Sequence, residues 1–533
     1  MLLEGVVVMK NKVIGVLIWV ILIFLYYYFM LPPINIQSIS FWGFVVYILI
    51  TESICLGFSS LFQKRPKLSN ISIAMVGSCF LVWGIILIVN FIYSPLFMAD
   101  MYSKRIAVDM DGDFQEDIEE VDFDKIPLLD KDSSRKLGDR VMGQMPEMVS
   151  QFYVSDLYTQ INYKNKIVRV TPLEYNGIFK YFNNCDKGVT GYIEVNSTTG
   201  EVNLVKLDKG IKYMPSALFG DDLYRYLRKV FPFDVFGSET FEVDEDGNPY
   251  WVIPVMKYKG VGLSKDISGV VLLDPISGEA SKYLLKEVPK WVDHVFSADL
   301  ILEQVDDWGS YKDGFFNSVF SQKNVVMTTD GYNYLASDDD IYLYTGITSV
   351  SSDESNIGFI LTNLRTKETV YYPVAGAEEY SAMDSAKGQV QQMKYTPTFP
   401  LLINLNGKPT YLISLKDNAG LVKMYAFVDV VDYQKVRVED ASLGIEKIAS
   451  NYLGSDYVTD SSNAISEEIT VNQVMSAVID GVSYYYLIDS NGSKYKVSIK
   501  IDEDIIPFIK NEDKLKVYYK EKKDVTTIIK IER

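Results

Sequence analysis

The sequence predicts an α+β protein that three N-terminal transmembrane helices hold to a membrane. Three observations predict it: apolar runs fill the first 93 residues, a hairpin pattern recurs in the middle of the chain, and closely spaced strands fill its end. They divide the chain into a three-helix anchor (1–96), an acidic linker (97–128), a first α+β module (129–215), a second module (216–310), further α+β modules (311–453) and a small β-barrel (466–533).

The apolar runs Val13–Leu31, Phe41–Phe62 and Ile71–Tyr93 form the predicted anchor. Each is long enough to cross a hydrocarbon core of about 30 Å as a helix. The first run ends in the bulky residues Tyr26–Leu31, which suit an interfacial aromatic belt better than a signal-peptide cleavage site. We therefore expect a retained span. Met1 and Met9 are both candidate starts of translation.

Basic residues predict the orientation of the anchor. Lys10 and Lys12 precede the first run, and Lys64, Arg65 and Lys67 lie between the second and third, whereas the loop 32–40 has no charged residue. The positive-inside rule then places the N-terminus in the cytoplasm and the chain after about residue 94 outside. Lys104 and Arg105 weakly oppose this orientation.

Composition restricts the compartment and the partners. The whole chain has a net charge of −18, and because residues 1–93 carry +3, the remainder carries about −21. An acidic outer region argues against nucleic acid, which needs Lys and Arg for its phosphates, and against electrostatic docking to anionic lipid or wall polymers. Cys185 is the only one of three cysteines outside the apolar runs, so no disulfide forms within the outer part. This predicts the plasma membrane of a bacterium, most simply a Gram-positive one, with an envelope protein or wall component as partner.

A strand, a polar turn and a second strand recur along the body. The turns are rich in Asn, Asp, Ser, Thr and Gly, which provide local side-chain hydrogen bonds and positive φ angles. We therefore predict small α+β modules in series. The copies are Gly191–Val202, Gly269–Ala280, Gly358–Thr369 and a degenerate fourth at Tyr425–Val436.

The second module is the most complete. An amphipathic helix at Asp221–Val230 precedes strands at Phe241–Asp244 and Tyr250–Tyr258 and the hairpin Gly269–Tyr283. This order is similar to that of the PepSY domain, a small α+β module of bacterial envelope proteins. The resemblance implies tandem PepSY-like modules.

Residues 120–440 also resemble an uncharacterised family of large bacterial membrane proteins. That resemblance implies a place in the envelope and no particular chemistry. The stretches that carry it are Val149–Phe152, Ile167–Leu173, Pro249–Val252, Val288–Asp293, Tyr344–Val350, Asp353–Asn356 and Leu415–Lys423.

Further helices are predicted at 129–142, 290–309, 376–392 and 440–453, and a polar linker at 457–466. Beyond it, five strands with one interposed helix at 505–510 predict an OB-like barrel. The strands are predicted at 467–478, 482–489, 493–500, 514–520 and 524–532.

No catalytic, cofactor-binding or metal-binding residues are predicted. His294 is the only histidine and lies beside a helical apolar pattern, so a structural role is expected. One histidine and one outer cysteine, Cys185, make a zinc site improbable. Carboxylate runs at 306–307, 338–340 and 378–379 leave a two-carboxylate hydrolase as an alternative.

Two other acidic features of the sequence, residues 109–120 and Glu52, are not predicted to form a binding site. Residues 109–120 partly match a calcium loop, but Phe114 stands where that loop needs Gly and Glu116 where it needs an apolar residue. A solvated linker is therefore expected. Glu52, inside the second apolar run, is expected to be protonated or hydrogen-bonded rather than part of an ion path, which would require further polar groups.

Together these features predict a non-catalytic, membrane-anchored envelope protein. Its extracytoplasmic PepSY-like modules would bind or regulate another envelope protein or a wall component. The alternative is a carboxylate-based cell-wall hydrolase or transglycosylase, and a transporter subunit that uses Glu52 is a third hypothesis.

Overall fold

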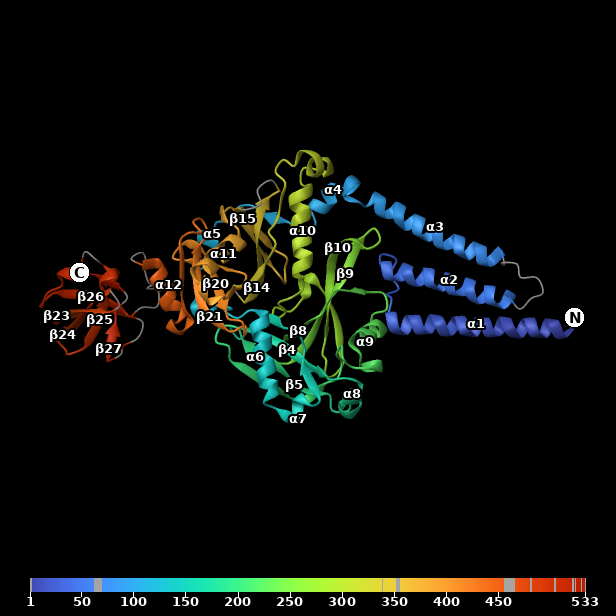
Figure 1. Cartoon of the computed structure of the whole chain (residues 1–533), viewed down its shortest axis with the longest axis horizontal. Helices are drawn as coiled ribbons and strands as arrows, with labels where there is room; N and C mark the ends of the chain where they lie inside the picture. Colours follow the sequence, from blue (N-terminus) through green and yellow to red (C-terminus); the bar gives the residue numbers. More distant parts are fainter. Residues whose placement is uncertain are drawn as a thin grey trace.

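The computed structural model has a mixed α+β fold, with apolar helices projecting from one side of a body of sheets (Figure 1). It describes residues 2–61, 70–337, 339–350, 355–454, 465–479, 482–502, 505–519, 522, 524–528 and 530–532. Lys64, Arg65 and Lys67, Asp338, and most of the predicted linker 457–466 lie outside the described residues.

The anchor consists of three adjacent helices, α1 (Leu2–Met30), α2 (Ile39–Leu61) and α3 (Asn70–Ile92). Two of them contain a stretch long and apolar enough to span a membrane: Val13–Met30, with a mean hydropathy of 2.5, and Ile73–Ile92, with 2.3. The shorter apolar stretch described in α2 ends at Cys55. In the part of the chain that the structure describes, two helices are thus both long and apolar enough to span a membrane, where three were predicted.

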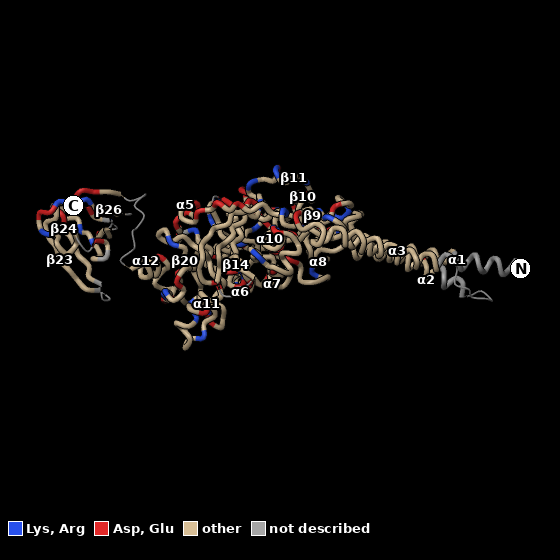
Figure 2. The backbone as a smooth tube through the Cα atoms, turned by 90° about the horizontal axis from the view of Figure 1, so that it is seen from above, with Lys and Arg blue, Asp and Glu red and all other residues tan. Residues whose placement is uncertain are grey.

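Helix α2 contacts both α1 and α3. Trp19 Nε1 of α1 donates to the Ile48 carbonyl of α2 at 3.3 Å, and the rings of Tyr26 and Tyr47 lie 4.3 Å apart. Charged residues are concentrated in the body, while the described part of the anchor is almost free of them (Figure 2). Glu52 lies partly exposed on α2.

Four sheets in the body repeat one strand topology, and we name them units 1 to 4. Each unit has five strands. The first two are short and both pair with the third, long strand, which continues into a meander formed with the fourth and fifth strands. Unit 1 contains β2 (Phe152–Val154), β3 (Thr159–Tyr163), β4 (Lys166–Tyr175), β5 (Val189–Asn196) and β6 (Val202–Ile211). Unit 2 contains β7 (Val235–Phe236), β8 (Thr240–Val243), β9 (Pro249–Lys259), β10 (Leu263–Leu273) and β11 (Ala280–Leu284).

Units 3 and 4 follow the same order. Unit 3 contains β12 (Val326–Thr328), β13 (Asn333–Ser337), β14 (Asp340–Ser349), β15 (Ser355–Asn363) and β16 (Thr369–Tyr372), with β1 (Val108–Asp109) and β17 (Gly376–Ala377) added to it. Unit 4 contains β18 (Thr396–Pro397), β19 (Leu401–Leu405), β20 (Lys408–Lys416), β21 (Val422–Asp429) and β22 (Val436–Asp440).

The predicted hairpin turns are confirmed in all four units. At the end of the fourth strand of each unit, an Asn or Asp Oδ1 accepts hydrogen bonds from two backbone N–H groups further along the turn, at 2.8–3.3 Å. Such bonds make the turn largely independent of the surrounding sheet. The four residues are Asn196, Asp274, Asn363 and Asp429.

A helix precedes each unit: α6 (Lys131–Gly143), α9 (Leu223–Val230), α10 (Ala298–Tyr311) and α11 (Glu379–Gln389). Helix α12 (Ile445–Leu453) follows unit 4. The helix predicted at 290–309 begins later, at Ala298, because the Ser297 side chain caps it by accepting from Leu300 N. Before that cap, the backbone of Val295 and Phe296 donates instead to the Leu364 carbonyl.

The cores of the units join in series. One apolar cluster spans units 1 and 2, a second spans units 2 and 3, and a third spans units 3 and 4. Strand β3 of unit 1 also contacts β14 of unit 3. The row of units therefore curls back on itself, and unit 1 faces units 3 and 4.

Residues 97–128 pack along this body. They include α4 (Pro95–Ser103), β1, which pairs in parallel with β16, and α5 (Phe114–Asp117). Phe114, at the glycine position of the calcium-loop pattern, is buried, and Asp113 caps α5 by accepting from Gln115 N at 2.8 Å. No group of three or more His, Cys, Asp or Glu side chains in the described part of the chain is arranged to hold a metal ion.

The C-terminal region has its own core and a sheet in the order β27-β25-β24-β23-β26-β28. It has six strands rather than the five predicted, because the last predicted strand is divided in two. A short 3-10 turn, Ile506–Phe508, replaces the predicted helix. The strands are β23 (Ile465–Ile479), β24 (Val482–Asp489), β25 (Lys494–Ser498), β26 (Lys514–Tyr519), β27 (Val525–Thr527) and β28 (Lys530–Glu532).

Unit 2 holds the ends of the anchor helices. The tip of the β9–β10 hairpin bonds to α3, where Val261 N donates to Asn90 Oδ1 at 2.8 Å and Asn90 Nδ2 donates to the Val261 carbonyl at 3.0 Å. Arg228 Nε of α9 donates to the Leu31 carbonyl, just after α1, at 3.0 Å. These bonds fix the direction in which the helices leave the body.

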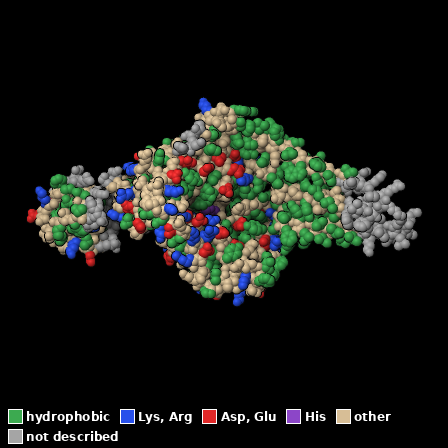
Figure 3. Space-filling view, viewed as in Figure 1, with side chains coloured by type: hydrophobic (Ala, Val, Ile, Leu, Met, Phe, Trp, Pro, Cys, Tyr) green, Lys and Arg blue, Asp and Glu red, His purple; other side chains and the backbone are tan. Residues whose placement is uncertain are grey.

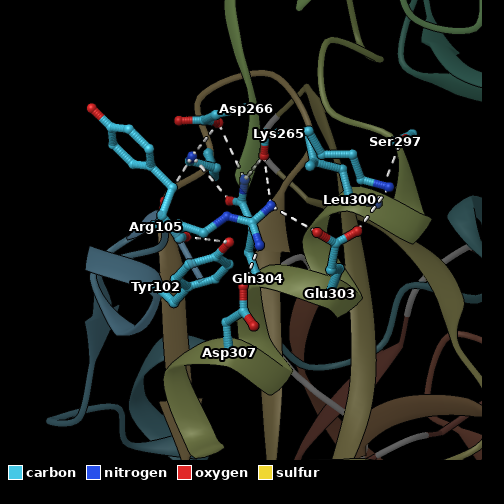
Figure 4. Close-up of polar contacts among 11 residues, drawn as sticks. Tyr102, Arg105, Lys265, Asp266, Ser297, Leu300, Glu303, Gln304 and Asp307 are labelled. Atoms are coloured by element: carbon cyan, nitrogen blue, oxygen red, sulfur yellow. Dashed lines mark hydrogen bonds and ion pairs between the residues drawn. The ribbon is translucent and has the colours of Figure 1, made fainter. Parts of the chain in front are cut away.

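A buried ionic network forms a second joint, between the end of α4 and α10 (Figure 4). The guanidinium of Arg105 bonds Asp307, Glu303 at 3.0 Å and the Lys265 carbonyl at 2.6 Å. The Arg105 carbonyl accepts from Lys367 Nζ at 3.0 Å. Although Arg105 opposes the effect, burial raises the pKa of Asp307 to about 6.

We expect Arg105→Met to destabilise the folded protein by about 3–5 kcal/mol, because it leaves a desolvated carboxylate without its cation. Lys104→Met is the matched control: its partner is Asp100, and both side chains are mostly exposed, so a change within about 0.5 kcal/mol is expected. Denaturant unfolding of both variants in detergent measures the difference, and equal small losses would contradict a structural role for the network.

Candidate functional site

A pocket of about 360 Å³ lies where unit 1 faces units 3 and 4. Tyr158 and Arg169 come from unit 1, Tyr334 from β13, and Phe399 and Leu412 from around β19 and β20. Residues 127–131 form one edge. In Figure 3 the middle of the body is hollowed and surrounded by acidic and basic side chains, in contrast to the hydrophobic surface beside the anchor.

The alternation of strands β3 and β4 brings two polar side chains to the same face of unit 1, and one of them, Arg169, lines the pocket. Ile161 and Val168 pair across the two strands and belong to the core that units 1 and 2 share. Gln160 and Arg169 are the next cross-strand pair, so they lie on the opposite face of the sheet. Both are buried, with 1% and 6% of their surface exposed.

The repeated topology shows how unusual this pair is. In every unit, one residue of the third strand pairs on one side with the residue just before the turn Asn or Asp. On its other side it pairs with a residue of the second, short strand. In units 2, 3 and 4 both members are apolar or aromatic, whereas unit 1 has Gln and Arg. The pairs are Gln160–Arg169, Phe241–Trp251, Tyr334–Leu343 and Leu402–Tyr411.

Arg169 forms no ion pair with a described residue, although the charge of Asp130 acts on it from beyond ion-pair distance. The described residues make no hydrogen bond or ion pair to its guanidinium, and its Nε is buried without a partner. Burial lowers the pKa of Arg169 to about 10, so it stays charged at neutral pH. The amide nitrogen and oxygen of Gln160 are also buried without partners. Groups in this condition are expensive to keep in a fold. A bound anion would satisfy the N–H donors of Arg169 and of the Gln160 amide, whereas the Gln160 oxygen requires a donor.

The nearest carboxylate on the pocket wall is committed to other contacts. Asp130 forms an ion pair with Lys416, and its Oδ1 accepts from Ser133 N at 2.9 Å at the start of α6. Together the Lys416 contact and the Ser133 hydrogen bonds outweigh burial and lower the pKa of Asp130. The ion pair of Asp130 is therefore made with Lys416 and not with Arg169, on which Asp130 acts only at longer range.

A second polar cluster lies behind the pocket. Glu242 accepts from Asp293 N at 2.8 Å and His294 N at 3.2 Å, and Asp293 accepts from Asn162 N at 2.8 Å. Burial raises the pKa of Glu242 to about 7. Burial, together with the charge of Glu242, raises the pKa of Asp293 well above 3.8. Both carboxyls are buried, with 0% and 1% of their surface exposed, and they accept from backbone N–H groups, although Asp293 Oδ1 has no partner among the described residues.

His294 belongs to this cluster. Its Nε2 lies 2.6 Å from the Gln160 carbonyl, and its ring meets Tyr334 edge-on with centroids 5.6 Å apart. Burial lowers its pKa to about 4, so the ring is neutral at physiological pH. Cys185 lies after α8 (Ile178–Asn184), with its Sγ directed to the Phe182 carbonyl rather than to His294. The arrangement does not bring a cysteine–histidine pair together.

The remaining acidic runs contribute to the fold. Asp307 pairs with Arg105 and Asp306 accepts from Thr328 N at 2.8 Å. Asp340 forms an ion pair with Arg365 at 2.6 Å, and buried Glu379 accepts from Asn356 Nδ2 at 3.3 Å. Of the described pocket-lining residues only Asp130 is a carboxylate, so the pocket lacks the facing pair that the hydrolase alternative requires.

Neither a protein-family model nor a curated protein matches the sequence. The PepSY likeness and the membrane-protein family therefore remain predictions from the residues. The site itself was not predicted: Arg169 lies inside the stretch Ile167–Leu173, but a lone arginine in a strand is no motif. Alignment of the four units on their turn Asn or Asp would have shown it at an otherwise apolar position.

We expect Asp293→Asn to stabilise the protein more at pH 8 than at pH 5. The unfolded carboxyl ionises near 3.8, whereas the folded carboxyl retains its proton to higher pH, so the wild type loses stability as pH rises between the two values. The variant has no ionisation there, and its advantage should grow with pH. Urea unfolding at both pH values measures this.

Asp246→Asn, in the exposed turn between β8 and β9, is the control and should change stability little at either pH. An advantage of Asp293→Asn that does not depend on pH would contradict a raised pKa at this position.

Proposed function

We propose that this chain is a non-catalytic, membrane-anchored protein of the bacterial envelope whose pocket beside unit 1 binds an anionic wall component. The observation that carries the proposal is the unpaired, buried cross-strand pair Gln160–Arg169 at a position that is apolar or aromatic in the other three units. We further propose that three helices cross the membrane, that the units of the body are PepSY-like, and that the C-terminal region is OB-like.

Several features support the anchor and its direction. Helix α2 contacts both helices of membrane-spanning length, as a third span of the same bundle would. Arg105, which weakly opposed an outward-facing body, is neutralised by Asp307 and Glu303, so it no longer counts as a free basic residue beside the membrane. The body then faces outward from the plasma membrane, and the net charge and cysteine usage favour a Gram-positive cell.

The pocket favours a small ligand over a protein surface. Its volume of about 360 Å³ matches a sugar ring or a short peptide, and Tyr158, Tyr334 and Phe399 provide aromatic walls against which a ring can pack. Arg169 would hold a carboxylate or phosphate by two parallel N–H···O bonds, and the Gln160 amide lies beside it on the same face of the sheet. Wall fragments that combine sugar, peptide and carboxylate have this chemistry.

The test uses the full chain in detergent and muramyl dipeptide as the probe. We expect millimolar probe to raise the melting temperature of the wild type and to leave that of Arg169→Met unchanged, because the ligand stabilises only the state that binds it. Arg135→Met, which removes a half-exposed arginine of α6 paired with Asp156, should respond as the wild type does.

Glycerol phosphate and inorganic phosphate form the second arm of the experiment. A response to phosphate alone would identify a phosphate-bearing wall polymer as the ligand class. An equal response of Arg169→Met and the wild type to every probe, or no response in either, would contradict the proposal.

A further inference from the structure

Large apolar side chains are exposed next to the end of α1. Phe179 is 82% exposed, Phe233 63%, Ile178 60%, Phe182 56% and Phe219 55%. The rings of Phe182 and Phe219 lie 6.1 Å apart, which joins α8 to the turn before α9. We name these five residues the apolar ledge. Aromatic exposure of this extent in a soluble body marks a surface that something covers.

Hydrogen bonds tie the ledge to the end of α1 and the loop that follows it. Ile34 N donates to the Pro232 carbonyl at 2.9 Å, and Asn35 Nδ2 donates to the Phe233 carbonyl at 3.0 Å. The Arg225 guanidinium lies 4.2 Å from the centre of the Tyr28 ring and donates to the Phe219 carbonyl at 2.9 Å. Helices α8 and α9 accordingly lie on the anchor side of the body in Figure 1.

The surroundings of the ledge have the composition of a membrane interface. Lys180 follows Phe179 directly, Lys229 lies on α9, and the loop after α1 exposes Ile34 and Ile36 by 49% and 69%. Aromatic rings mixed with lysines are typical of protein that lies at the headgroup level without crossing the bilayer.

We propose that the apolar ledge inserts into the interfacial layer of the same membrane leaflet in which α1 ends. The occupant of this surface is therefore phospholipid, and the body has a peripheral contact with the membrane in addition to its helices. Because the ledge is bonded to α1, the contact would fix the tilt of the body against the bilayer. The inference rests on the membrane anchoring of α1, which the experiment tests separately.

The experiment places single fluorescent labels on the full chain in lipid nanodiscs that hold one copy each. In a background with Cys55, Cys79 and Cys185 replaced by Ala, an NBD label is attached at Phe179→Cys, at Ile21→Cys in the middle of α1, or at Val431→Cys. Val431 is 67% exposed in the turn between β21 and β22, far along the chain from the anchor. Quenching by lipids brominated at shallow or deep acyl positions reports depth.

We expect the Phe179 label to lose about half of its fluorescence with shallow bromines and less with deep ones, the Ile21 label to show the reverse, and the Val431 label to be unaffected. Quenching at Ile21 without quenching at Phe179 would overturn the ledge proposal and leave the membrane anchor intact. The same result is expected if a partner protein, and not lipid, covers the ledge. Loss of quenching at Ile21 would overturn the membrane anchor itself.

Discussion

The buried charge of Arg169, which forms no ion pair with a described residue, is the constraint on which the functional account depends. A guanidinium that is taken out of water without an anion costs the fold several kilocalories per mole, and most proteins pair such a group or replace it. Here the neighbouring acid, Asp130, is bound to Lys416, and the cross-strand neighbour, Gln160, also lacks partners. A fold that retains this cost has a use for the charge, and the adjoining pocket provides room for an anion.

The repeated architecture explains how the pocket arises. Four units of one topology share cores in sequence, and the row curls until unit 1 meets units 3 and 4. At the position equivalent to Arg169, the other units have Trp251, Leu343 and Tyr411, which are all fully buried. The same position therefore holds a packed core side chain in three units and a charged one in unit 1. The bonds of unit 2 to Leu31 and Asn90, and the Arg105 network, then hold this assembly in a fixed relation to the anchor helices.

Local signals predicted much of the fold. The turn residues Asn196, Asp274 and Asn363 have side chains that bond their own turns, so the repeat was visible without tertiary information. Signals that depend on distant partners were missed. Residues 97–128 appeared as a solvated linker because nothing local shows that Phe114 is buried under unit 3 or that Arg105 meets α10. The pocket was missed for the same reason, since its walls come from segments that meet only after the units curl.

The free energy of unfolding of Gln160→Leu/Arg169→Leu, without added ligand, tests the central claim most directly. Leu402 and Leu343 show that leucine suits both register positions in other units. If the polar pair is retained for a ligand, the double variant should be about 1–4 kcal/mol more stable than the wild type, as when buried charges are replaced by apolar side chains of similar size. A loss of stability of similar size would show that Arg169 and Gln160 support the fold, and the account would be wrong.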